Sequence, residues 1–257
     1  MARRIAITGA EGLIGGVLRA GLGDAGEIVP LTLTPQPFPS LVADITDEAA
    51  LGRAFAGVDA VVHLAATATL AAEWRDVLRN NIGGTRQVFE TAARAGVRTV
   101  VFASSGHVLG GAEQRAGPSL YDLDDPRVFD ETTPPEPDTL YALGKVYGEA
   151  LGYHYAHARG LRVISVRFGT VLADNDPKSP VPGRGRSASL SLAERYPRIR
   201  AKWLSHRDCC QLVRCCLDAE VRHAVIFGTS NNPRQIWSLR SARALGYVPL
   251  DAAPKEL

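Results

Sequence analysis

A tyrosine and a lysine four residues apart, Tyr141 and Lys145, have the types and the spacing for acid–base chemistry. On a helix this spacing places both side chains on one face, with the ammonium close to the phenol. A tyrosine with its ordinary pKa of about 10 is a poor base, but a neighbouring cation favours the phenolate and moves that pKa toward working pH. A surface pair on an amphipathic helix is the alternative interpretation. The stretch Ser104-Ser105-Gly106-His107 favours the chemical one, because it follows a predicted strand at its carboxyl end, where α/β proteins place catalytic side chains.

The elements that position these side chains begin with a glycine-rich turn. The β-branched run at residues 5–7 leads into Gly9, Gly12 and Gly15, spaced G-x-x-G-x-x-G, and then into an apolar helical pattern. Gly9 permits the turn, Gly12 lets backbone approach a pyrophosphate, and Gly15 lets the helix lie close to the strand, so that the helix N-terminus faces a bound anion. Glycine triplets also occur as plain turns. The motifs further along the chain favour a dinucleotide site.

Strands and helices alternate along the rest of the chain. Strands are predicted at residues 27–33, 58–64, 97–103, 161–168 and 224–228, and helices at about 72–95, from 139 on, from 206 on and at 237–245. This order predicts an α/β fold, a Rossmann-type doubly wound parallel sheet with a small C-terminal substrate lobe. We expect residues 1–170 to bind NAD(P) and carry the catalytic residues. Residues 171–257 form the expected lobe, whose strand and helix pack back on the main domain.

Two stretches of this pattern are rich in glycine. The predicted helix at 72–95 contains Gly83-Gly84, and because each glycine costs about 1 kcal/mol relative to alanine, the pair predicts a close backbone approach. The linker at 110–138 is rich in glycine, proline and acids, which predicts a surface excursion over the cofactor site.

The choice of dinucleotide depends on the end of the second strand. An acid there binds the adenosine ribose and a nearby arginine accommodates a 2′-phosphate, but this chain has Thr32-Leu33-Thr34. Asp44 could present its carboxylate to the adenine amino group, or it could cap a helix beginning near Asp47, and both interpretations stay open. Because no arginine follows the second strand, we expect NAD as the cofactor and leave NADP open.

Composition and charge exclude several classes of function. The chain has 257 residues, 46% hydrophobic and 22% charged, which is ordinary for an enzyme-sized domain. A net charge of +2, without aromatic residues interleaved among basic clusters, argues against nucleic-acid binding. With no apolar run of membrane-spanning length, we expect a cytoplasmic protein without a membrane partner. The four cysteines, Cys209, Cys210, Cys215 and Cys216, lack metal-site spacing, so we expect buried, reduced thiols and no metal.

Basic residues gather between residues 178 and 202. This stretch contains a single acid, Glu194, and seven basic residues: Lys178, Arg184, Arg186, Arg195, Arg198, Arg200 and Lys202. A solvated basic loop is one interpretation. The other is an insertion that covers a substrate, since arginines clustered after the carboxyl end of a strand suit a carboxylate or phosphate.

Several ordered motifs together resemble one family along nearly the whole chain. They are Thr8-Gly9-Ala10-Glu11-Gly12-Leu13-Ile14-Gly15, Asp44-Ile45, His63-Leu64-Ala65-Ala66, Asn81-Ile82-Gly83-Gly84-Thr85, Ser104-Ser105 and Tyr141 through Lys145. The chain thereby resembles the extended short-chain dehydrogenase/reductases of the NAD-dependent epimerase/dehydratase group. Within that group, the stretches at 102–107, 167–170 and 203–208 look like those of uronate dehydrogenases.

The resemblance implies a role for each matching residue. Ser105, Tyr141 and Lys145 are the implied catalytic set, with Tyr141 as the acid/base and Asn81 supporting the site. The implied cofactor contacts are Gly9, Glu11, Gly12, Leu13, Ile14, Gly15, Asp44, Ile45, Leu64, Ala65, Ala66, Asn81, Tyr141, Lys145 and Phe168. The implied substrate contacts are Thr67, Ser105, Gly106, His107, Tyr141, Thr170 and Arg198. Arg198 precedes Trp203 by the five residues that separate the carboxylate-binding arginine from the tryptophan in uronate dehydrogenases, and Arg200 is the alternative.

The implied activity is hydride transfer between nicotinamide and a hydroxyl or carbonyl carbon of a small anionic, sugar-like substrate, in a homodimer. This chain departs from uronate dehydrogenases in four places: it lacks the ribose-binding aspartate, has Gly106 in place of an asparagine and Ala68 in place of a serine, and carries a longer basic insertion. A nucleotide-sugar epimerase or dehydratase is the alternative, and a non-catalytic NAD(P)-binding sensor is a third. The epimerase or dehydratase would use the same hydride step transiently, without net cofactor reduction.

Overall fold

Seven parallel strands form one sheet in the part of the chain that the computed structural model describes, residues 2–179 and 191–255. The strands are β1 (Arg4–Thr8), β2 (Glu27–Thr32), β3 (Leu41–Val42), β4 (Ala60–His63), β5 (Thr99–Ser105), β6 (Arg162–Phe168) and β7 (His223–Gly228). Their order is β3-β2-β1-β4-β5-β6-β7, with every neighbouring pair parallel. Strands β2 and β3 are added on one side of β1, and β4 to β7 are added on the other side. The point between β1 and β4 where this order reverses is the switch point, the place where doubly wound sheets bind ligands. The predicted Rossmann-type fold is confirmed.

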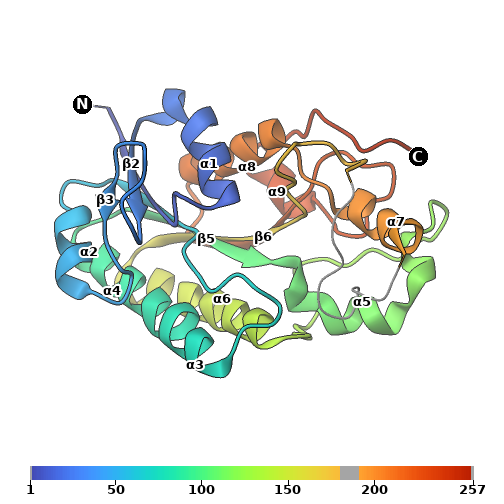
Figure 1. Ribbon diagram of the computed structural model, residues 1–257, viewed down its shortest axis with the longest axis horizontal. Helices are drawn as coiled ribbons and strands as arrows, with labels where there is room; N and C mark the ends of the chain where they lie inside the picture. The colour runs from blue at the N-terminus through green and yellow to red at the C-terminus, as the bar shows by residue number, and fades with distance from the viewer. Residues whose placement is uncertain (1, 180–190, 256–257) are drawn as a thin grey trace.

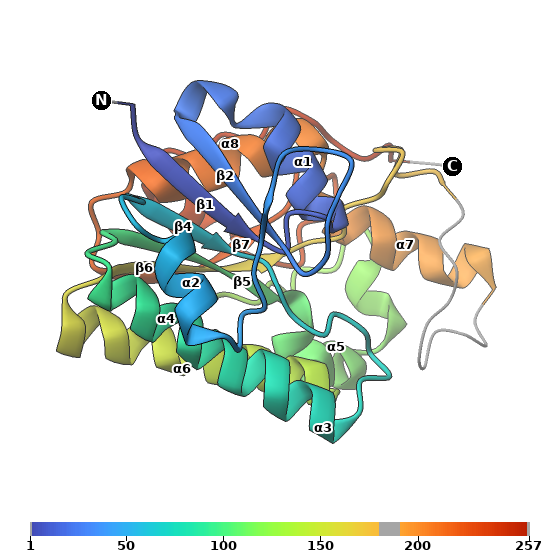
Figure 2. The same ribbon diagram turned by 60° about the vertical axis from the view of Figure 1, so that its left-hand side comes forward.

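Helices cover both faces of this sheet (Figure 1). They are α1 (Leu13–Gly21), α2 (Glu48–Ala54), α3 (Trp74–Asp76), α4 (Thr85–Arg94), α5 (Gly110–Ala116), α6 (Leu140–Arg159), α7 (Leu192–Lys202), α8 (His206–Asp218) and α9 (Arg240–Ala244). Shorter helical turns are η1 (Gly23–Ala25), η3 (Gly106–Leu109) and η4 (Pro118–Tyr121), and η2 (Val77–Gly84) is π-helical. Figure 2 shows α1 and α8 on one face and α2, α4 and α6 on the other.

Each face of the sheet has its own apolar core. Alternate residues of a strand point to opposite faces, so Ile5 and Ile7 pack with α1 and α8 while Ala6 packs with α2, α4 and α6. A sheet covered on both sides needs strands that are apolar throughout. β5 meets this need, since all of its residues are buried.

The helix predicted at 72–95 is present as α3, η2 and α4, with a π-helical middle. The close approach predicted from the glycine pair is found at Gly84, where a Cβ atom would lie 2.6 Å from Cδ1 of Ile45. The side chain of Ile45 therefore lies in the core, and only its backbone remains for the cofactor contact predicted for this residue.

The linker at 110–138 differs from the predicted surface excursion. It contains α5 and η4, and Glu113 and Leu120 are buried. Its glycines serve close packing, because a Cβ on Gly110 would overlap the carboxylate of Asp138. The surface prediction is wrong for this part of the linker.

The C-terminal third also differs from its prediction in one place. Within the basic run, residues 180–190 lie outside the described residues, and residues 192–202 form helix α7, so a loop is the wrong structure for that part. β7 pairs with β6 in the main sheet. The division into two domains stays a prediction.

The cysteines lie on α8, at the interface with α1. All four are free thiols; Cys209, Cys210 and Cys216 are buried and Cys215 is half-buried. Burial raises the pKa of each thiol. Within residues 2–179 and 191–255, the structure has no helix both long and apolar enough to cross a bilayer. The cytoplasmic location stays a prediction.

Candidate active site

The glycine-rich turn between β1 and α1 forms a cradle that side chains would fill. Gly9 has a φ of +68°, and a Cβ atom on it would lie 2.9 Å from the backbone of Ala65. A Cβ on Gly15 would lie 2.5 Å from the carbonyl oxygen of Gly9, so α1 begins directly against the turn. Gly12 caps α1 without a side-chain hydrogen bond to the first N–H groups of the helix. These N–H groups and the surrounding space fit a pyrophosphate, as the predicted dinucleotide requires.

His63, the last residue of β4, forms hydrogen bonds that connect β4 with β1 and α4. Its Nδ1 lies 2.8 Å from the hydroxyl of Thr8, and its Nε2 lies 3.2 Å from that of Thr85. Burial lowers the pKa of His63 to about 3, so the ring is neutral. Thr8 also accepts a hydrogen bond from the backbone N–H of Ala65 at 3.2 Å. His63 is therefore a packed structural residue that fixes the Leu64-Ala65-Ala66 segment beside the cradle.

Asn81 fixes the next part of this segment from η2. Its Oδ1 accepts from the N–H of Thr67 at 2.8 Å, and its Nδ2 donates to the carbonyl of Thr67 at 3.2 Å. Its Cβ would lie 2.8 Å from a Cβ placed on Gly144 of α6. Asn81 thus joins the Thr67 loop to the helix that carries Tyr141 and Lys145.

Asp44 is not the cap of the helix that begins near Asp47. Asp47 is the cap of α2, accepting from the N–H of Ala50 at 3.0 Å. Asp44 instead binds the backbone and hydroxyl of Thr46 and pairs with Arg79 at 2.6 Å. Although partial burial opposes it, these hydrogen bonds and the arginine lower the pKa of Asp44. Asp44 is a charged carboxylate beyond β3, and its contact with adenine stays a prediction.

Ser105, Tyr141 and Lys145 converge at the carboxyl end of β5. Thr139 caps α6 by accepting from the N–H of Ala142, so Tyr141 lies in the first turn and Lys145 one turn later. The Lys145 ammonium lies 5.5 Å from the centre of the Tyr141 ring and donates a 2.6 Å hydrogen bond to the carbonyl of Ala103. Ser105, the last residue of β5, is 8% exposed and hydrogen-bonds Tyr141.

Burial controls the protonation of this group. It raises the pKa of the Tyr141 phenol, with the Ser105 hydrogen bond acting in the opposite direction. Burial also lowers the pKa of Lys145 to about 8. The prediction that Lys145 draws the Tyr141 pKa down toward working pH is therefore wrong for this structure. The reason is that the ammonium is directed at the Ala103 carbonyl and the phenol is removed from water.

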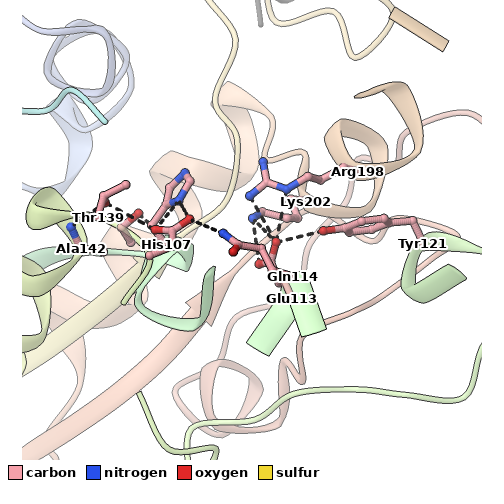
Figure 3. A network of polar contacts seen from close by, with 10 residues as sticks. His107, Glu113, Gln114, Tyr121, Thr139, Ala142, Arg198 and Lys202 are labelled. Atoms are coloured by element: carbon pink, nitrogen blue, oxygen red, sulfur yellow. Dashed lines mark hydrogen bonds and ion pairs between the residues drawn. The ribbon is translucent and has the colours of Figure 1, made fainter. Parts of the chain in front are cut away.

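A polar network extends from this group toward α7 (Figure 3). His107 Nδ1 lies 3.0 Å from Oδ2 of Asp138, and the His107 ring meets the edge of the Tyr141 ring at a centroid distance of 6.5 Å. Further along, Glu113 of α5 is 4% exposed. Its carboxylate accepts from Lys202 at 2.9 and 3.1 Å, from the Tyr121 hydroxyl at 3.0 Å, and from Arg198 Nε at 3.3 Å.

The charges of this network support one another. Burial opposes ionisation of Glu113, but Lys202 and Arg198 hold its pKa below the usual range. Burial and the neighbouring Arg198 lower the pKa of Lys202 to about 8, against the attraction of Glu113. The side chain of Arg198 is 36% exposed, whereas that of Lys202 is 5% exposed. Arg198 is thus the cation of this pair that remains accessible.

The structure separates the two arginine candidates. Arg200 donates to the backbone carbonyls of Pro254, at 3.3 Å, and of Lys255 near the C-terminus, and its guanidinium lies over the Tyr196 ring. Arg198 instead faces the Glu113 network. Of the two, Arg198 is the one brought to the candidate site.

Three other predicted contacts lie at the same edge of the sheet. Phe168 pairs in register with Ser105 across β5 and β6. Thr170 follows β6, and its N–H donates to the carbonyl of Lys202 at 2.6 Å, which connects this edge to α7. Gly106 is buried, and a Cβ on it would overlap the Trp237 ring. This overlap explains the glycine where uronate dehydrogenases have asparagine, and it leaves only backbone atoms of Gly106 for a substrate.

Several residues of the network were missing from the sequence prediction of the site, among them Glu113, Lys202 and Asp138. Glu113 lies in an acid-rich linker and Lys202 at the end of a basic run, where neither stands out. Asp138 has the signature of a helix cap, but Thr139 is the cap, and Asp138 binds His107. The glycines at 110 and 111 were a signal of close packing in this stretch, and in the structure they lie against Asp138 and Glu136.

The chain is similar to several known proteins. A family model described as NAD dependent epimerase/dehydratase family matches residues 5–192. The NAD-dependent glucose-6-phosphate dehydrogenase of Haloferax volcanii is 36% identical over 263 residues, covering 98% of this chain and 94% of that protein. The L-arabinose 1-dehydrogenase (NAD(P)(+)) of the same organism is 37% identical over 254 residues, covering 96% of each chain. Among solved structures, a mutated uronate dehydrogenase matches with a TM-score of 0.81 and 28% identity, covering 98% of this chain and 83% of that one.

Proposed function

The chain belongs to the NAD-dependent epimerase/dehydratase family, and from this premise we propose that it is an NAD-dependent dehydrogenase acting on a small sugar or sugar acid. The observation that carries the proposal is the convergence of Ser105, Tyr141 and Lys145 at the carboxyl end of β5. Two relatives are named as dehydrogenases of a sugar phosphate and of a neutral sugar, and a structural neighbour as a dehydrogenase of uronates.

Each residue of this group has a distinct task. The chemistry that NAD supplies when bound is acceptance of a hydride from the carbon that bears the substrate hydroxyl. The Tyr141 oxygen takes the hydroxyl proton, and Ser105 hydrogen-bonds the same substrate oxygen and steadies the charge that develops on it. Lys145 places a positive charge beside the phenol and binds the nicotinamide ribose. In the reverse direction, the Tyr141 phenol returns the proton to a carbonyl oxygen.

The glycine cradle and the neighbouring strand ends hold the dinucleotide. Gly9, Gly12 and Gly15 shape the turn in which the N-terminus of α1 binds the pyrophosphate. Asn81 keeps the Thr67 loop in place beside it. Asp44, held by Arg79, binds the adenine end.

We place the far end of the substrate at Arg198. Lys202 contacts both oxygens of Glu113 and neutralises it, so the charge of Arg198 is available to a carboxylate or phosphate on a sugar. Glu113 engages Nε and Nη2 of Arg198, and Figure 3 shows a terminal nitrogen of the guanidinium pointing away from Glu113. A small anionic sugar is the substrate that this arrangement favours.

The substrate end is tested with a matched pair of sugars. Glucuronate and glucose differ only at the carbon that bears the acid, so Arg198→Ala should lower kcat/KM for the acid by tens to hundreds of fold and that for glucose much less. Arg200→Ala is the control, since Arg200 binds the C-terminal backbone. Equal losses for both sugars would make Arg198 structural.

The overall proposal is tested by turnover. Nucleotide sugars are incubated with the protein and NAD separately, and their products are analysed. The protein is also mixed with NAD and a panel of aldoses, sugar phosphates and uronates, and the absorbance of reduced nicotinamide is followed. We expect net reduction with at least one of them. Conversion of a nucleotide sugar without net reduction would instead make the protein an epimerase or dehydratase.

We also propose a homodimer. Leu78 of η2 and Leu140 and Leu143 of α6 are 48%, 40% and 41% exposed. The two elements contact each other and lie on the outer face of the molecule (Figures 1 and 2). A second copy that covers this face would remove these apolar side chains from water.

A further inference from the structure

A carboxylate reaches the end of β2 from the glycine-rich turn. The residues that follow this strand, Leu33 and Thr34, carry no charge, and the acid that binds an adenosine ribose in many Rossmann folds is missing from the sequence there. In the structure, Oε1 of Glu11 accepts a hydrogen bond from the backbone N–H of Leu33 at 3.0 Å. Glu11 is exposed, so its second oxygen is open to a ligand. The turn that cradles the pyrophosphate thus also delivers an acid to the end of β2.

We propose that the Glu11 carboxylate binds the adenosine ribose and makes the protein select NAD over NADP. An ionised carboxylate only accepts hydrogen bonds, and the 2′- and 3′-hydroxyls of the NAD ribose donate them. A 2′-phosphate offers no such donor and carries negative charge, so the same carboxylate repels NADP. The inference rests on the proposed function, because it assumes that the cradle binds a dinucleotide.

The charged groups around Glu11 give a 2′-phosphate little compensation. The guanidinium of Arg19 lies 3.5 Å from the centre of the Phe38 ring and donates to the carbonyl of Ala10 at 2.9 Å. Arg79 pairs with Asp44 at 2.6 Å. Arg79 would have to give up its ion pair with Asp44 to bind a phosphate, and Arg19 would have to bind it through terminal nitrogens that the contacts with Ala10 and Phe38 hold in place.

Substitution of Glu11 by glutamine tests the charge alone. The amide oxygen of glutamine can still accept the hydrogen bond of Leu33, so Glu11→Gln keeps the loop contact. Glu27→Gln is the matched control: it removes the same charge from an exposed glutamate at the opposite end of β2, where Glu27 pairs with Arg4. Glu11→Arg is the second variant, which replaces the acid with a phosphate-binding group.

Dissociation constants for NAD and NADP are measured by titration calorimetry, so the readout does not depend on a substrate. Unfolding temperatures of all variants show whether they fold. We expect the wild-type protein to bind NAD more tightly, and Glu11→Gln to weaken NAD binding while strengthening NADP binding, changing the preference by about tenfold or more. Glu11→Arg should move the preference further, and Glu27→Gln should leave it unchanged.

The outcomes separate the inference from the proposed function. If the wild-type protein binds neither dinucleotide, the proposed function fails and this inference fails with it. If it binds NAD but Glu11→Gln weakens both dinucleotides equally, Glu11 only supports the loop and the inference alone is overturned. Tighter binding of NADP than of NAD by the wild-type protein would overturn it as well.

Discussion

The hydroxyl of Ser104 lies 2.5 Å from Oε1 of Glu149, and both residues are buried. This contact connects the end of β5, one residue before Ser105, with the middle of α6. Arg167 of β6 completes the arrangement with two hydrogen bonds of 2.8 Å to the same carboxylate. Three elements that meet at the candidate active site are therefore held together by one buried ion pair.

Removal of the arginine from this pair should strongly destabilise the protein. Arg167→Met leaves the Glu149 charge buried without its partner, which should cost about 3–5 kcal/mol of unfolding free energy. Arg98→Met is the matched control, because the Arg98–Asp59 pair is largely exposed and should contribute at most about 1 kcal/mol. Urea unfolding curves measure both values. Similar losses of unfolding free energy in the two variants would show that the buried Arg167–Glu149 pair contributes no more to stability than the exposed Arg98–Asp59 pair.

Lys145 should support both binding and turnover. Lys145→Met removes the ammonium beside the Tyr141 ring and leaves the Ala103 carbonyl without its donor. We expect turnover to fall and NAD binding, measured by fluorescence titration, to weaken by roughly tenfold or more. Lys178→Met, a change of the same kind at an exposed site, is the control. Unchanged NAD affinity in Lys145→Met would rule out the ribose contact.

The two directions of the reaction should respond oppositely to pH. Burial raises the pKa of Tyr141, so the phenol is protonated at neutral pH and the phenolate fraction grows as pH rises. Oxidation uses the phenolate and should accelerate from pH ~6 to ~10, whereas reduction uses the phenol and should slow at the alkaline end. Initial rates in both directions measure this. An oxidation rate that falls steadily with pH would contradict Tyr141 as the base.

The proposed dimer depends on apolar residues of α6 and η2. Leu143 is 41% exposed, so Leu143→Glu should change the single chain little but place charges in the interface. Light scattering at micromolar concentration should give a dimer for the wild-type protein and a shift to monomer for the variant. Val248→Glu, at another exposed apolar side chain, is the control. A monomeric wild-type protein would refute the dimer.

Local spacing was sufficient to predict much of the fold and the core of the candidate site. The glycine triplet and the apolar runs determine the β1–α1 turn and the strands, and the spacing of four places Tyr141 and Lys145 together because a helix has 3.6 residues per turn. The contacts of Glu113 with Lys202 could not be predicted in this way. They join residues 89 positions apart, and their meeting depends on how α5 and α7 pack.

The sequence also could not show which of Arg198 and Arg200 faces the candidate site. Residues two apart on a helix point in different directions, so the sequence indicates that Arg198 and Arg200 face different surroundings but not which one faces the site. The protonation state of Tyr141 also could not be predicted from the spacing of residues in the sequence. The pKa of Tyr141 follows from burial and from the direction of the Lys145 ammonium, and both are properties of the folded chain.

The measurement that tests the proposed chemistry most directly compares Tyr141→Phe with the wild-type protein in turnover and in NAD binding. The substitution removes only the phenolic oxygen, so NAD affinity and the unfolding temperature should stay the same. Turnover of the best sugar substrate should fall by about 10² to 10⁴-fold, the usual contribution of a positioned acid or base. Turnover close to wild type in a folded, NAD-binding Tyr141→Phe variant would contradict the assignment of proton transfer to Tyr141.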